Sequence, residues 1–218
     1  MSVIPFKIDG VDRTLVSTRE EYESIGGLNG DVIFIQNLDE SQLAHTAGSN
    51  ASYDLRVGDE YRDHRDSRKT ELPDNGTVCL QTGSAVIIET EEWLHFPKSR
   101  FGHIVPKVSL LQKGAAIISS KIDPGYEGKL LITVFNLGKR KIILKKGQKF
   151  CTFYMVDIKG GALPYQKEPK RIVGEYKKGI VNKFRDFIEN NQTFLTALLI
   201  VLTSLLILIQ LVELIQTN

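Results

Sequence analysis

The chain has 218 residues, a net charge of +2 and two cysteines that lie far apart, Cys79 and Cys151. This length allows one domain of ordinary size with appendages. The nearly neutral charge balance gives no general argument for nucleic acid, so neither DNA nor RNA is expected as a partner. The cysteines show no C-x-x-C pattern and adjoin apolar strand residues, so we expect them to be buried free thiols.

The first 29 residues are expected to form an N-terminal arm and a short helix. Helix-start chemistry occurs over Ser17–Glu21, where a hydroxyl followed three residues later by glutamate makes a capping box. Gly26 and Gly27 should end this helix, because glycine readily adopts the left-handed conformation found after a helix C-terminus.

Residues 30–162 carry the pattern of a mainly β domain. Short apolar runs alternate with turn residues at about the 8–12-residue interval that is typical of an all-β barrel or sandwich. In the first long strand, Leu55, Val57 and Tyr61 should alternate inward. Neither G-x-G-x-x-G nor a P-loop occurs, so folds that use those motifs to bind phosphate are not supported. We expect strands over 31–35, 77–80, 85–89, 102–106, 115–119, 129–135, 141–144 and 150–156.

The stretch Ser119–Asn136 is central to this domain, and its middle is I-D-P-G-Y-E-G, residues 122–128. Pro124 fixes the φ that position i+1 of a tight turn needs, and Gly125 accepts a positive φ at i+2. The turn should bring the Asp123 carboxylate and the Tyr126 ring together at a strand end, which suits a small planar ligand. An ordinary hairpin with an exposed acid has the same pattern.

Three stretches together resemble the dCTP deaminase and dUTPase superfamily. They are the central I-D-P-G-Y-E-G followed by an apolar strand and Asn136, the early Ala51–Gly58, and the late Leu144–Phe150. The resemblance covers about residues 30–156. It implies a distorted jelly-roll β-barrel of dUTPase-like type and a homotrimer that binds a (deoxy)nucleotide between its subunits. The nucleotide-binding residues that it implies are Lys107, Ser109, Gln112, Lys113, Asp123 and Tyr126, with Asp54, Gly125 and Gly128 as structural residues of the motifs.

The deaminase branch of this superfamily uses an R-S-S-x-x-R stretch and a glutamate on the strand after the I-D-P-G turn. Here Lys107 takes the place of the first arginine, and Ser109 keeps one of the serines. Gln112 replaces the second arginine, although the adjacent Lys113 would substitute if the register slipped by one. The glutamate falls at Thr133, which cannot transfer protons at neutral pH. The resemblance therefore implies a protein that is degenerate as a deaminase.

The diphosphatase branch requires less. There the aspartate matched by Asp123 activates a water, and the aromatic residue matched by Tyr126 packs on the deoxyribose. Mg²⁺ enters with the nucleotide triphosphate and is held largely through waters, so no direct metal ligand is expected. Thr152 stands where this branch usually has a phosphate-binding glutamine, and the residues after the late motif do not match its glycine-rich C-terminal arm. The diphosphatase pattern is thus kept in part.

Residues 163–218 lie beyond the resemblance. Residues 163–192 combine an apolar helical face with clustered lysines and arginines, which is typical of an amphipathic helix on an anionic membrane surface. The uncharged run 190–212 predicts a transmembrane helix over 193–213 and a short tail over 214–218. Because the basic flank precedes this run, we expect a single-pass membrane protein with a cytoplasmic N-terminal domain and membrane lipid as a partner.

Polar residues in this run recur every seven positions, at Thr196, Thr203 and Gln210. Leu199, Leu206 and Glu213 fall three residues after each of them, and the spacing is typical of the a/d seam of a left-handed helical bundle. Polar groups in hydrocarbon need partners, which facing helices would supply. The pattern predicts that the tails of a trimer associate, and chance placement of three polar residues is the alternative.

The remaining aromatic and histidine residues carry no metal-binding pattern. His45, His64, His95 and His103 lack metal-ligand spacing and are expected at surface or edge positions. Trp93 is interpreted as a packing residue.

Three functions fit these observations. The favoured one is a membrane-anchored trimer that binds a (deoxy)nucleotide and acts as a nucleotide sensor or membrane effector. The second is an active enzyme of pyrimidine deoxynucleotide metabolism, either a dCTP deaminase or a dUTP diphosphatase, tethered to the membrane. The third is a trimeric membrane scaffold that binds no nucleotide.

Overall fold

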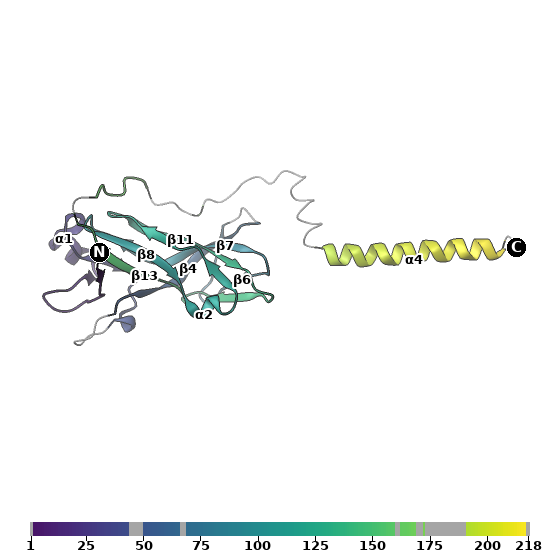
Figure 1. Ribbon diagram of the computed structural model, residues 1–218, viewed down its shortest axis with the longest axis horizontal. Helices are drawn as coiled ribbons and strands as arrows, with labels where there is room; N and C mark the ends of the chain where they lie inside the picture. The colour runs from purple at the N-terminus through teal and green to yellow at the C-terminus, as the bar shows by residue number, and fades with distance from the viewer. Residues whose placement is uncertain are drawn as a thin grey trace. The chain divides into compact units, whose positions relative to one another are not determined.

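The computed structural model describes residues 2–43, 50–65, 69–159, 162–168, 172 and 191–216. The chain forms two compact units, Met1–Glu175 and Tyr176–Asn218. Figure 1 shows the strands of the first unit and helix α4 of the second. The predicted basic helix lies for the most part outside the described residues, and the five-part division of the chain stays a prediction.

The first unit is built mainly of antiparallel strands, so the mainly-β prediction is confirmed. One sheet has the main path β10-β8-β13-β4-β7-β11-β9, and β6 pairs separately with β12. At its margins β1 joins β13, β5 joins β4, and β3 joins β7 and runs parallel to β2. The bounds are β1 Val3–Ile4, β2 Leu15–Val16, β3 Ile33–Gln36, β4 Tyr53–Asp63, β5 Thr70–Glu71, β6 Thr77–Leu80, β7 Ala85–His95, β8 Arg100–Pro106, β9 Ala115–Ile117, β10 Ser120–Ile122, β11 Glu127–Asn136, β12 Ile142–Lys145 and β13 Lys149–Asp157.

The predicted distorted β-barrel is not closed in the part of the chain that the structure describes. The sheet path has two ends, β9 and β10, and each of these strands is three residues long. They follow one another in the chain, separated only by Ile118 and Ser119, yet β9 pairs with β11 while β10 pairs with β8. The two ends of the sheet are therefore joined by the chain and not by a ladder of hydrogen bonds.

Short helices and turns cover the strand ends. Helix α1, Arg19–Ser24, begins as predicted, because the hydroxyl of its N-cap residue Thr18 accepts a hydrogen bond of 3.4 Å from the amide of Glu21. It ends just before Gly26, whose φ of +106° is left-handed. Helix α2 is Val108–Leu111, and 3₁₀ turns lie at Gly27–Asn29 and Glu40–Gln42.

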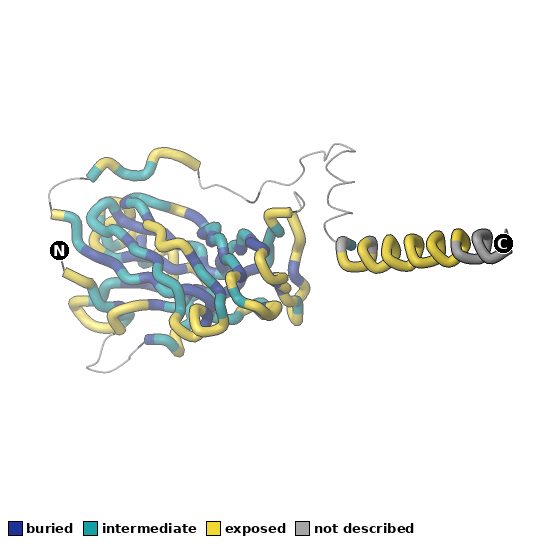
Figure 2. Tube along the Cα trace, turned by 45° about the vertical axis from the view of Figure 1, so that its right-hand side comes forward, coloured by how far each residue is buried: buried dark blue, intermediate teal, exposed yellow. Residues whose placement is uncertain are grey.

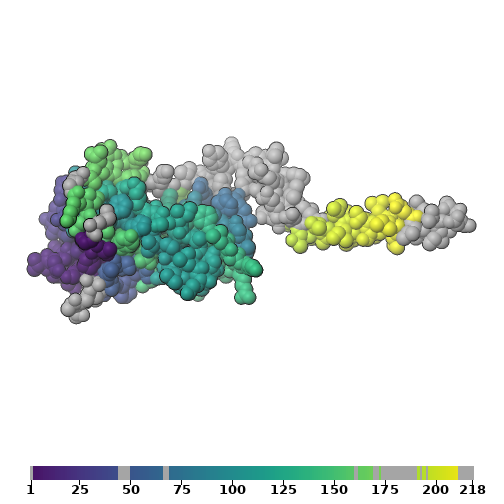
Figure 3. All heavy atoms as spheres, in the orientation of Figure 1, coloured from purple at the N-terminus to yellow at the C-terminus, as the bar shows by residue number. Residues whose placement is uncertain are grey.

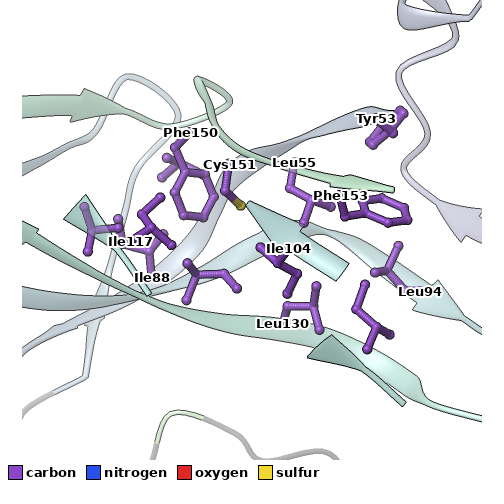
Figure 4. Packing of buried hydrophobic residues seen from close by; sticks show 14 of the residues in the cluster. Tyr53, Leu55, Ile88, Leu94, Ile104, Ile117, Leu130, Phe150, Cys151 and Phe153 are labelled. Carbon is purple, nitrogen blue, oxygen red and sulfur yellow. The ribbon is translucent and has the colours of Figure 1, made fainter. Parts of the chain in front are cut away.

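The core lies between the strands of the first unit, as Figure 4 shows at close range. Along β11 the burial alternates strictly, as expected for a strand with one face toward the core. Leu55 and Val57 of β4 are fully buried and Tyr61 packs against the same core, which confirms the predicted inward alternation. In Figure 2 the buried stretches of the first unit follow these central strands, and its exposed stretches lie mostly in turns and short segments.

Two predictions about individual side chains are corrected by this packing. Cys151 is buried as expected, but Cys79 is exposed, because it lies on the outward face of β6, which pairs with β12 alone. His95 was expected near the surface and is instead 4% exposed, with its ring stacked 4.6 Å from that of Phe34. Trp93 packs beside the His95 ring as predicted, although its indole N–H is buried without a hydrogen-bond partner.

The second unit contains helix α4, Gln192–Gln216. Its large apolar side chains are exposed wherever they are described between Phe194 and Ile209. Among the residues that the structure describes, no helix meets the length and apolarity needed to cross a membrane. The helix expected over 193–213 is present as part of α4. Its transmembrane character is not supported.

The polar residues of α4 are satisfied locally where their bonds are described. The Thr203 hydroxyl lies 3.0 Å from the Leu199 carbonyl oxygen and 2.9 Å from that of Ile200, and Ser204 donates to Ile200 as well. A hydroxyl that is already bonded to its own helix has less need of a partner helix. The predicted association of the C-terminal helices of a trimer stays a prediction. The local hydrogen bonds of Thr203 give it no support.

Candidate functional site

One group of predicted residues meets where β4, β8 and β13 lie side by side, and we call Asp54, Lys107 and Thr152 the Asp54 cluster. Thr152 pairs directly with Asp54 across β13 and β4, and its hydroxyl donates to Asp54 Oδ1 at 2.5 Å. Lys107 follows β8 and forms an ion pair with Asp54 Oδ2. Both carboxylate oxygens thus have partners, and the sheet register fixes them in place.

The backbone at Asp54 is held by a neighbouring side chain. The Gln42 amide accepts from the Asp54 N–H and donates to the Asp54 carbonyl, both at 3.0 Å. This pair of bonds replaces a ladder partner at the start of β4. The direction of the Asp54 side chain is therefore set by the strand on one side and by Gln42 on the other.

A buried ion pair supports the same end of β4. The Glu92 carboxylate is fully buried and accepts from Arg56 Nε at 2.7 Å, from the Arg56 amide at 3.0 Å and from the Tyr53 hydroxyl at 3.2 Å. Burial raises the pKa of Glu92, and the bonds from Arg56 oppose that rise. The sequence did not predict this network. Glu92 lies in an acidic run, and only the burial pattern of β7 shows that Glu92 points into the core while Glu91 does not.

Helix α2 and the two residues that follow it carry the other predicted residues of this region. Leu110 is buried and anchors the helix, while Ser109, Gln112 and Lys113 are exposed. Lys107 precedes the helix as its N-cap residue and is the member that reaches Asp54. The structure therefore places this predicted set around one short helix, with three polar side chains at the surface.

The second group is the turn Asp123–Tyr126, which we call the Asp123 turn. The Tyr126 amide donates to the Asp123 carbonyl at 3.1 Å, and Gly125 has the positive φ, +71°, that the sequence predicted. Asp123 forms an ion pair of 2.7 Å with Lys121, and the Tyr126 hydroxyl donates to the Lys129 carbonyl at 2.6 Å. The acid and the ring lie at one turn, as expected.

The structure does not bring the two groups together within one chain. Ile122 pairs with Gly102 at one end of β8, whereas Lys107 follows the other end. Five residues of extended strand separate those positions, which corresponds to about 16 Å. Asp123 lies beyond Ile122 and so still further from Lys107. The two groups therefore lie toward opposite ends of β8 within one chain.

The position predicted for a catalytic glutamate is Thr133, in the middle of β11. It is half-buried opposite Ile87 of β7. No titratable group stands at this position, so proton transfer there has no donor or acceptor of useful pKa.

A hydrogen-bonded chain of side chains that the sequence did not predict lies where β8 pairs with β10 and β13. His103 Nδ1 is 2.6 Å from the Tyr154 hydroxyl, and His103 Nε2 is 2.7 Å from the Ser119 hydroxyl. The Ser119 hydroxyl also donates to the Ile104 carbonyl at 2.9 Å. The three residues come from β8, β13 and the residue before β10, so only the sheet register reveals this hydrogen-bonded chain.

The described residues contain no group of three or more histidine, cysteine or acidic side chains that would hold a metal ion. The acids near the strand ends are paired with lysines instead. Lys129 contacts Glu89 at 3.3 Å and Asp59 at 3.4 Å, and Lys146 contacts Asp59 at 2.8 Å. Burial raises the pKa of Glu89, and Lys129 counters it.

With this geometry in place, comparison with known proteins assigns the chain to a class. Residues 27–157 match the family described as dCTP deaminase-like, and the chain belongs to that family. Two similar proteins are dCTP deaminases. That of Thermococcus kodakarensis is 28% identical over 117 residues, which cover 53% of this chain and 74% of the relative, and that of Shewanella loihica is 28% identical over 178 residues, covering 79% and 84%.

Among solved structures, a 2'-deoxycytidine 5'-triphosphate deaminase from Agrobacterium tumefaciens is similar, with 20% identity and a TM-score of 0.45. The match covers 54% of this chain and 41% of that one. Similarity at this level carries no argument about function.

Proposed function

We propose that this protein binds a pyrimidine deoxynucleotide in sites shared between the subunits of a homotrimer, and that it acts as a nucleotide sensor. The observation that carries the proposal is the separation of the Asp54 cluster from the Asp123 turn. Both contain residues of the family motifs, yet they lie at opposite ends of β8 in one chain. One nucleotide contacts both only if neighbouring copies supply them.

The proposal includes the loss of deaminase chemistry. Three positions of the deaminase machinery depart from the family pattern, with Lys107 and Gln112 in place of arginines and Thr133 in place of glutamate. The binding side chains are kept, since Asp123 and Tyr126 form the expected turn. A site that keeps recognition but lacks a proton-transfer group suits binding better than turnover.

The test combines assembly with ligand titration on the full-length chain. Light scattering should give the mass of three chains, and calorimetry with dCTP, dUTP, dTTP and the ribonucleotides should give saturable binding of a pyrimidine deoxynucleotide. A monodisperse monomer would overturn the shared site. A trimer that binds none of these nucleotides would support the non-binding scaffold instead. In that case the ion pairs of Asp54 with Lys107 and of Asp123 with Lys121 would never be exchanged for a ligand.

The second candidate is a dUTP diphosphatase, favoured by the preserved Asp123 turn. In that function Asp123 would activate the attacking water, and Mg²⁺ would arrive with the triphosphate. The observed pair between Asp123 and Lys121 at 2.7 Å would have to open first. Chromatography of dUTP incubated with the protein and Mg²⁺ separates the two candidates, because only the enzyme forms dUMP.

We also propose, as a separate part, that α4 attaches the protein to a membrane with the β unit on the cytoplasmic side. The support is the uncharged run 190–212 and the exposure of the described apolar side chains of α4. Flotation of the full-length chain with anionic vesicles tests it. Replacement of Leu199 and Leu206 by Lys should abolish flotation, and protein that stays with the soluble fraction before any replacement would contradict the attachment.

A further inference from the structure

A segment of this chain that the family motifs do not include lies across the Asp123 turn, and we call residues 162–168 the strap. The Tyr165 amide donates to the Pro124 carbonyl at 2.6 Å. The Tyr165 ring lies 5.4 Å from the Tyr126 ring with an interplanar angle of 59°. Figures 1 and 3 show the strap in green at the surface of the β unit, and Figure 2 shows it as half-buried and exposed.

The strap sits tightly on the turn. A methyl group placed on Gly125 would come within 2.8 Å of Pro164 Cβ and 3.3 Å of Leu28 Cδ1. These distances are shorter than ordinary contacts between carbon atoms. No planar ligand fits between Pro164 and the turn while the strap keeps this position.

Both recognition side chains of the turn already have partners from their own chain. The Tyr126 ring meets Tyr165, while its hydroxyl is bonded to the Lys129 carbonyl. The Asp123 carboxylate meets Lys121 at 2.7 Å. A nucleoside that contacts the acid and the ring together must therefore replace contacts that the chain makes with itself.

We propose that the strap is a built-in competitor of the nucleotide: Tyr165 occupies the face of Tyr126 that a bound nucleoside needs, and binding displaces it. This inference rests on the proposed function. It differs from an arm that closes over a ligand, because the strap packs on the recognition side chains themselves.

The expected effect follows from the size of the contact. When a competing state must open first, the apparent dissociation constant is the intrinsic one divided by the open fraction. An aromatic pair of this kind corresponds to about a 3- to 10-fold factor. Loss of the Tyr165 ring should therefore tighten nucleotide binding by about that factor.

The experiment measures two quantities on the full-length protein. Calorimetry gives the affinity of Tyr165→Ala for the pyrimidine deoxynucleotide that the parent binds, with Tyr165→Phe as the matched control that keeps the ring. Acetylation by N-acetylimidazole, read by mass spectrometry, gives the reactivity of the Tyr165 hydroxyl in the unmodified parent with and without that nucleotide. The second measurement needs no variant, so it holds even if Tyr165→Ala folds poorly.

Support for the competitor is tighter binding by Tyr165→Ala, parent affinity for Tyr165→Phe, and a Tyr165 that reacts faster when nucleotide is bound. Weaker binding by Tyr165→Ala, or a Tyr165 protected by nucleotide, would overturn the inference and make Tyr165 part of the binding site. Unchanged affinity would also overturn it, while leaving nucleotide binding intact. Absence of binding by parent and variant alike would instead overturn the proposed function, and the competitor with it.

Discussion

The Asp54 cluster and the Asp123 turn both contain motif residues, but they are held in different ways. Asp54 is fixed by the strand that pairs with its own strand and by Gln42, and the Glu92–Arg56 pair holds the neighbouring residues of β4. The Asp123 turn is fixed by local turn chemistry and by a strap from far along the chain. A strand ladder resists opening, whereas a strap with few contacts opens at low cost. The Asp54 cluster is therefore expected to be the more rigid of the two regions, and the Asp123 turn the more adjustable one.

The largest expected effect is the absence of dCTP deamination, which depends on Thr133 of β11 and on neither of the two regions. Incubation with dCTP should release no ammonia above background, because Thr133 offers no group for proton transfer. Such a group typically contributes about 10²–10⁴-fold to a rate. An active dCTP deaminase assayed in parallel is the control, and ammonia release at its rate would show that another residue supplies the proton.

The next effect tests the rigidity of the Asp54 cluster. Glu92→Leu should lower the free energy of unfolding by about 3–5 kcal/mol, because it leaves the partly buried Arg56 charge without its partner. Urea denaturation measures the change. Glu91→Gln, on the opposite face of β7, should change the free energy of unfolding by less than about 0.5 kcal/mol.

The double variant Arg56→Met with Glu92→Leu sharpens this test. If the unpaired charge causes the loss, removing both partners should restore part of the stability. A double variant as unstable as the sum of the single ones would assign the loss to packing instead.

The third prediction joins the two regions. Asp123→Ala and Lys107→Ala should each weaken nucleotide binding about 10-fold or more, because each removes a charged group from a different half of the site. Calorimetric titration measures the affinity, and Lys139→Ala, an exposed lysine in the turn after β11, is the control. Parent affinity in either variant would remove that half from the site.

The smallest expected effect is a dependence of folding stability on pH that comes from His95, close in sequence to the contacts of the Asp123 turn. Burial lowers the pKa of His95, and the Glu127 carboxylate 3.4 Å away raises it in part. Below the ordinary histidine pKa of about 6.5 the unfolded chain then binds the proton more readily than the folded one. The stability contributed by neutral His95 is therefore complete above that pH and falls as the pH drops below it.

His95→Gln should flatten this dependence, measured as the difference in unfolding free energy between parent and variant from about pH 7.5 to about pH 5.5, a range that brackets the ordinary histidine pKa. The Phe96 amide next to His95 donates to the Tyr126 carbonyl at 2.8 Å, so His95 is adjacent in the chain to a residue that holds the Asp123 turn. The same slope in parent and variant would contradict a role for His95.

Short-range chemistry in the sequence determined much of the β unit. The Thr18 cap, the positive φ of Gly125 and the alternation of β4 depend on residues only a few positions apart, and each was predicted. The family motifs likewise identified Asp54, Asp123 and Tyr126 as residues of interest. Such signals depend on residues close in sequence, so they can be recognised without knowing which strands pair.

Only the tertiary structure decided which of these residues meet. Asp54 contacts Lys107 and Thr152 across 53 and 98 residues of sequence, and Tyr165 reaches Tyr126 from outside the motifs. The burial of His95, the exposure of Cys79 and the open ends of the sheet were also decided there. The physical reason is that strand pairing is chosen by which faces bury apolar surface together, and that choice depends on the whole chain at once.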